Sequence, residues 1–112
     1  MRFPALLIGL VVAATGTVFA DEPVGFQEGM QLFTQYKCQR CHSVDKDMAG
    51  PSLRSIAKKY ASDPHARDVL GTSILNGEIG KWDDSPVPMP PTKVQHSDLR
   101  PLVNWILSLN QY

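Results

Sequence analysis

Hydrophobic side chains recur at intervals of three and four residues along most of the chain, and no segment alternates strictly between apolar and polar positions. Intervals of three and four place side chains on one face of an α-helix, whereas strict alternation is typical of a half-buried strand. The pattern therefore predicts an all-α fold built from about four helices.

The first predicted helix runs from about Gly25 to Tyr36. Gly29 lies inside it, where glycine costs about 1 kcal/mol relative to alanine. Such a glycine is easiest to explain if another backbone passes close by. Three residues form the apolar face of this helix: Phe26, Met30 and Phe33.

The next two predicted helices follow closely on one another. One spans Ser52 to about Ala61, with its lysines facing water. The other begins with Asp63 as the N-cap and Pro64 at the first helical position, and it ends at Asn76-Gly77. Their inward-facing residues are Leu53, Ile56, Ala57 and Tyr60 in the first, and Val69, Leu70, Ile74 and Leu75 in the second.

The last predicted helix has Ser97 as its N-cap and runs to about Leu109, with Pro101 in its first turn. Before it lies a long loop from Gly80 to Val94 that contains four prolines. Proline restricts the backbone, and a loop of this length in a small domain usually has a function.

The N-terminus has the features of a secretory signal peptide. Arg2 is the only charged residue before Asp21, and the mostly apolar run that follows Arg2 ends in Val18-Phe19-Ala20. We expect cleavage after Ala20, export to the periplasm and a mature domain of residues 21–112. The alternative is an uncleaved membrane anchor, which the interspersed glycines and threonines disfavour.

Charge and size set further limits on the mature domain. Removing the leader leaves 92 residues with ten basic and eleven acidic side chains, a net charge of −1. Nucleic-acid binding needs a concentrated basic face, which this composition lacks. A domain this small gains little stability from its own core, so a large buried cofactor would stabilise it considerably.

The segment Cys38-Gln39-Arg40-Cys41-His42 indicates covalent haem attachment. Each thiol can add across one haem vinyl group to form a thioether, and the adjacent histidine can bind the iron. These are the only cysteines in the chain. A redox disulfide would normally follow a strand, and a zinc site would need a second pair of ligands. Neither condition is met by the sequence.

Five residues are candidates for the sixth iron ligand. We favour Met89 because prolines flank it on both sides in the long loop, so its thioether can bind iron without a large ordering cost. Met30 and Met48 are interpreted as packing residues. His65 and His96 lie near predicted helix starts and are interpreted as solvated.

The chain resembles class I cytochromes c, specifically the small bacterial monohaem group of the cytochrome c-551 type. The resemblance covers the whole mature chain, and the proline-rich methionine loop narrows it to this group. It is carried by Gly29-x-x-x-Phe33, Cys38-x-x-Cys41-His42, Met48-Ala49-Gly50-Pro51, Asn76-Gly77, Trp82, Pro88-Met89-Pro90-Pro91 and Trp105-Ile106-Leu107-Ser108.

The resemblance implies a class I cytochrome c fold of about four helices wrapped around one covalent haem c. It implies that the first and last helices cross at Gly29, with Phe33 near Trp105. It also implies that the Pro51 carbonyl accepts a hydrogen bond from His42 and that Trp82 contacts a haem propionate. Asp83-Asp84-Ser85 lengthens the stretch after Trp82 relative to the family pattern and puts that contact in doubt. We expect the charged residues Asp45-Lys46-Asp47 to be solvated surface.

These features predict a diffusible electron carrier, a soluble monomer without enzyme activity. Its partners would be redox proteins: a respiratory oxidase or reductase, or a dehydrogenase. One alternative is a dedicated electron-transfer subunit of a larger dehydrogenase complex. Another is a haem sensor or enzyme with an exchangeable sixth ligand, for which His65 and His96 are the remaining histidines.

Overall fold

A computed structural model describes residues 1–16, 24–82 and 87–111 of the chain. Helices α1 (Phe26–Gln35), α2 (Leu53–Lys59), α3 (Ala66–Asn76) and α4 (His96–Ser108) form the body, with short 3-10 helices η1 (Cys38–Arg40) and η2 (Leu109–Gln111). Within the described ranges the only extended pairing is an isolated antiparallel bridge between Glu78 and Met89. The predicted all-α class is confirmed.

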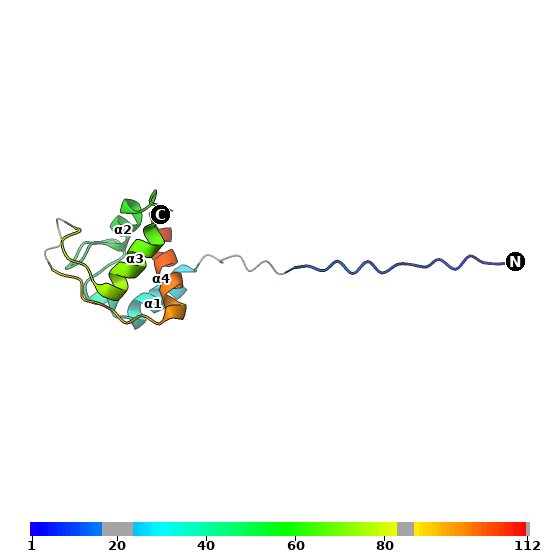
Figure 1. The fold of residues 1–112 in the computed structure, drawn as a ribbon, viewed down its shortest axis with the longest axis horizontal. Helices are drawn as coiled ribbons and strands as arrows, with labels where there is room; N and C mark the ends of the chain where they lie inside the picture. The colour runs from blue at the N-terminus through cyan, green and yellow to red at the C-terminus, as the bar shows by residue number, and fades with distance from the viewer. Residues whose placement is uncertain (17–23, 83–86, 112) are drawn as a thin grey trace.

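Residues 1–16 have no regular secondary structure and are exposed, and Figure 1 shows them extending from the helical body. The expected cleavage site after Ala20 lies outside the described residues. Among those that are described, no helix is both long enough and apolar enough to cross a bilayer.

Helices α1 and α2 match their predicted ranges closely. Gly25 and Tyr36 are the caps of α1. Ser52 is the N-cap of α2, and its hydroxyl accepts a hydrogen bond from the Ser55 amide at 3.1 Å. This bond satisfies one of the amides that the first helical turn leaves unpaired. The Ser52 hydroxyl in turn donates a hydrogen bond to the Ser55 hydroxyl at 2.8 Å.

The predicted start of α3 at Pro64 is wrong by two residues, because α3 begins at Ala66. The Asp63 carboxylate accepts from the amide of His65, two positions on, at 2.8 Å. Such an Asx-turn competes with helical pairing, so the chain turns once before the helix begins. The prediction that Leu75 faces inward is also wrong, since this side chain is 41% exposed.

The predicted start of α4 is also wrong, because α4 begins earlier than expected. Its N-cap is Gln95 rather than Ser97. Backbone amides of Asp98 and Leu99 bond to the Gln95 carbonyl at 2.9 and 3.1 Å, so the first turn closes without a side-chain cap. Pro101 is therefore the sixth helical residue, and it cannot donate the helical bond expected at that position.

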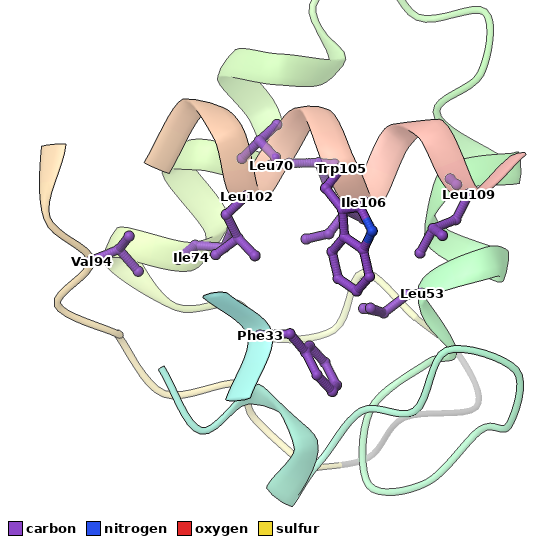
Figure 2. Close-up of a cluster of buried hydrophobic side chains, with 11 residues drawn as sticks. Phe33, Leu53, Leu70, Ile74, Val94, Leu102, Trp105, Ile106 and Leu109 are labelled. Carbon is purple, nitrogen blue, oxygen red and sulfur yellow. The ribbon is translucent and has the colours of Figure 1, made fainter. Parts of the chain in front are cut away.

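Helix α4 lies at the centre of the core and packs against α1, α2 and α3. Figure 2 shows its buried side chains converging with Phe33 of α1 and Leu53 of α2. The α1–α4 crossing at Gly29 is confirmed, with the Phe33 and Trp105 rings 6.0 Å apart. However, the group beside Gly29 is the Trp105 indole and not a backbone. Phe26 is 53% exposed, although its ring meets Trp105 edge-on at 5.9 Å.

Candidate haem site

A large open cavity lies between the helices and the segment that precedes α4. It holds about 1190 Å³ of empty space, including its open mouth. Pockets for organic ligands and cofactors are typically concave and mostly apolar. The aliphatic and aromatic lining of this cavity is contributed by α1, α2, α3 and α4: Phe33, Leu53, Ile56, Leu70, Ile74, Leu102 and Ile106.

The two cysteines and the adjacent histidine line one part of this cavity. Lys37 adopts a left-handed conformation, with φ of 60°, which ends α1 and starts the tight turn of η1. In that turn the Cys38 carbonyl accepts from the amides of Cys41 at 3.1 Å and His42 at 2.9 Å. The local backbone therefore brings Cys38, Cys41 and His42 to the same cavity.

The loop after the haem motif folds back on His42. The Gly50 amide donates to the Cys41 carbonyl at 2.8 Å, and the Pro51 carbonyl lies 2.7 Å from Nδ1 of His42. A carbonyl can only accept, so Nδ1 carries the hydrogen and Nε2 keeps its lone pair for a metal. A Cβ at Gly50 would lie 2.5 Å from Cε1 of His42, so this glycine makes room for the ring.

Two acidic residues of this loop have partners that hold the loop in place. The Asp47 carboxylate accepts from the Ser52 amide at 2.8 Å, and Asp45 forms an ion pair with Arg54 on α2. Both carboxylates are exposed, but each has a partner. The expectation that Asp45, Lys46 and Asp47 are solvated surface is confirmed, and two of these side chains also hold the loop.

Of the five candidate sixth ligands, Met89 is the one that lines the cavity. Met30 packs against the hydrophobic core, as expected. Met48 is 51% exposed, so the expectation that it packs in the interior is wrong. His65 and His96 are exposed at the starts of α3 and α4.

Trp82 also lines the cavity, and a lysine lies over the face of its ring. The Lys59 ammonium lies 4.2 Å from the ring centroid and donates to the Lys81 carbonyl at 3.1 Å. The expected contact of Trp82 with a propionate stays a prediction. Asp83 to Ser85, which put that contact in doubt, lie outside the described residues.

Sequence reasoning missed three polar residues at the cavity. Ser73 is buried in α3, and its hydroxyl donates to the Glu78 carboxylate. The Lys81 ammonium lies 2.7 Å from the same carboxylate oxygen, and this hydrogen bond raises the pKa of Lys81. The only sequence signal was the position of Glu78, directly after the Asn76-Gly77 helix stop.

The structure disfavours the other interpretations of the cysteine pair. Burial raises the pKa of the Cys38 thiol, whereas reactive redox cysteines have a lowered thiol pKa. No group of three or more His, Cys, Asp or Glu side chains in the described ranges could hold a metal ion. A zinc site of the usual four-ligand kind therefore has no candidate there.

The residues present do fit a haem. Two thiols two residues apart in the sequence, an imidazole with a free nitrogen and a thioether all line one apolar cavity. Softer nitrogen and sulfur donors of this kind suit haem iron, and the apolar walls suit the porphyrin. No ligand is needed from outside this set of side chains.

Comparison with known proteins shows the family to which the chain belongs. The family model for Cytochrome c matches residues 26–110. Cytochrome c-551 of Stutzerimonas stutzeri is 42% identical over 96 residues, covering 86% of this chain and 90% of that protein. Cytochrome c-552 of Hydrogenobacter thermophilus is 36% identical over 103 residues, covering 92% and 95%.

The fold is also similar to that of solved structures. The crystal structure of wild-type Nitrosomonas europaea cytochrome c552 matches with a TM-score of 0.67 and 36% identity, covering 72% of this chain and 99% of that one. The chain therefore belongs to the cytochrome c family, as a small class I c-type cytochrome that carries one covalently attached haem c.

Proposed function

We propose that this chain is an exported electron carrier that moves single electrons between redox proteins. Cys38 and Cys41 would attach the haem through thioether bonds, and His42 and Met89 would bind its iron. The observation that carries the proposal is the 2.7 Å contact between His42 Nδ1 and the Pro51 carbonyl, which leaves Nε2 as the ligand atom, in the cavity that Met89 also lines.

The two proposed axial ligands explain a carrier better than a catalyst. When bound, the haem supplies reversible one-electron chemistry at its iron. If both side chains bind the iron, no place is left for a substrate or a gas, and methionine ligation would favour the reduced state. The apolar walls keep water away from the cofactor, which further favours the reduced state.

Export and partners follow from the same proposal. The apolar leader directs the chain to the periplasm, where cleavage after Ala20 leaves residues 21–112. There the mature protein accepts an electron from a donor such as a dehydrogenase and delivers it to an oxidase or reductase. The names cytochrome c-551 and c-552 of its relatives accord with this role.

Three measurements on protein purified from the periplasm test the proposal. Intact-mass spectrometry should give residues 21–112 plus one haem, retained under denaturing conditions. The reduced protein should not bind carbon monoxide, and its haem should undergo a reversible one-electron change. Haem extracted by acid-acetone would contradict covalent attachment, and rapid carbon monoxide binding would favour a sensor or enzyme instead.

A further inference from the structure

The segment that carries Met89 is fixed to the end of α3 by backbone contacts. Glu78 and Met89 exchange both backbone hydrogen bonds, at 3.0 and 2.9 Å. The Thr92 amide donates to the Ile74 carbonyl at 2.8 Å. These backbone hydrogen bonds therefore fix the position of Met89 relative to the C-terminal turn of α3.

Gly77 permits this close approach. Its φ is +80°, and a Cβ there would lie 2.6 Å from the Met89 carbonyl oxygen and 3.1 Å from the Pro91 ring. A glycine just after a helix commonly adopts a positive φ and ends the helix. Here it also brings Glu78 next to Met89.

The Glu78 side chain also holds the turn at Gly77 against α3. Its carboxylate accepts from the buried Ser73 hydroxyl on α3 and from the Lys81 ammonium at 2.7 Å. The Ser73 hydroxyl has one hydrogen and also lies 2.9 Å from the Val69 carbonyl, but the charged carboxylate is the stronger acceptor. The carboxylate thus joins α3 to the segment just beyond the bridge.

We propose that Glu78 is a positioning residue for the Met89 thioether. Its carboxylate locks residues 77–81 against α3, and the backbone bridge transmits that constraint to Met89. The inference rests on the proposed ligation of iron by Met89. Removing the carboxylate should let the bridge open more often, so that Met89 leaves the iron more readily and outside ligands enter faster.

The test uses the holoprotein with Glu78→Ala, Glu78→Gln and Gly29→Ala. Cyanide binding to the oxidised protein measures how often the sixth position opens, and amide hydrogen exchange of Met89 measures opening of the bridge itself. Loss of a hydrogen bond to a charged group should speed both processes about tenfold in Glu78→Ala. Glu78→Gln keeps an acceptor for Ser73, so it should recover most of the protection.

Gly29→Ala is the control, because it disturbs the α1–α4 crossing without touching residues 77–92. The inference holds if only Glu78→Ala accelerates both processes and glutamine rescues them. It is overturned if Glu78→Ala leaves Met89 exchange unchanged, or if Gly29→Ala accelerates it equally. If exchange responds as expected but cyanide binding does not, Glu78 positions the loop but not an iron ligand. That outcome overturns the inference because it contradicts the proposed binding of iron by Met89.

Discussion

The indole ring of Trp105 occupies the space where Gly29 would carry a side chain. A Cβ atom built on Gly29 would overlap the indole carbons Cγ, Cδ1 and Cδ2. Trp105 is 1% exposed and lies against the rings of Phe26 and Phe33, so it has little room to move aside. This pair sets how closely α1 can approach α4.

Gly29→Ala should therefore destabilise the protein, although alanine is the better helix former. Overpacking a rigid core costs about 1–3 kcal/mol, which exceeds the gain of up to about 1 kcal/mol in helix propensity. Gly71→Ala in α3 is the matched control, because a Cβ there would meet only Leu99, at an ordinary 3.6 Å. It should stabilise by about 0.5–1 kcal/mol. Urea unfolding of both variants checks the prediction, and the same sign of change in both would contradict it.

Gly50 and Pro51 should respond differently to alanine. Pro51→Ala keeps the carbonyl that bonds to His42, so it should shift the reduction potential only modestly. Gly50→Ala forces a methyl group into the imidazole ring and should change the potential and the haem spectrum more. His42→Ala should prevent a normal holoprotein. Redox titration and haem yield measure these effects, and equal damage from Pro51→Ala and His42→Ala would mean that the ligand is misassigned.

The Tyr36 hydroxyl should make stability depend on pH in the alkaline range. It donates to the Asp98 carboxylate at 2.5 Å, and this hydrogen bond, followed by burial, raises the pKa of Tyr36 above its ordinary value. The stabilisation is therefore complete below the unfolded pKa of about 10 and is lost as pH rises through the higher folded pKa. The stability advantage of wild type over Tyr36→Phe should shrink above about pH 10. Denaturant unfolding at several pH values checks this, and a constant difference would contradict it.

Lys59 should contribute to holding Trp82 at the cavity. A cation over an exposed aromatic face contributes about 0.5–1 kcal/mol, and a double-mutant cycle with Lys59→Met and Trp82→Leu should recover a coupling of that size. Lys59→Arg should keep it, because a guanidinium also stacks on an indole. Lys58→Met is the control, since Lys58 is exposed on the neighbouring position of α2. Coupling of Trp82 to Lys58 as large as to Lys59 would contradict the assignment.

The sequence predicted the helices, and it named four residues that the structure brings to one cavity: Cys38, Cys41, His42 and Met89. Periodic apolar positions predicted α1 and α2, and the observed helices lie within the predicted ranges. The starts of α3 and α4 were wrong because an Asx-turn at Asp63 and a backbone-only cap at Gln95 override side-chain capping rules. Which residue starts such a helix depends on a few hydrogen bonds, and the residue types alone do not show which of these bonds form.

The polar contacts in and near the cavity could not be predicted because they depend on how helices and loops are placed in the fold. Lys59 meets Trp82, and Arg54 meets Asp45, only once α2 has been placed beside two different loops. Ser73 and Glu78 are close in sequence, but their contact depends on the turn at Gly77. No periodic pattern marks such pairs.

The absorption spectrum of the oxidised holoprotein, compared with that of Met89→Ala, is the most direct test of whether Met89 binds the iron. If Met89 binds the iron, wild type should show the weak long-wavelength sulfur-to-iron band, and Met89→Ala should lose it, bind cyanide readily and have a lower reduction potential. Met30→Leu and Met48→Leu should keep the band, because one side chain packs on the core and the other is half-exposed. A wild-type spectrum without the band, or loss of the band in Met48→Leu, would contradict ligation by Met89.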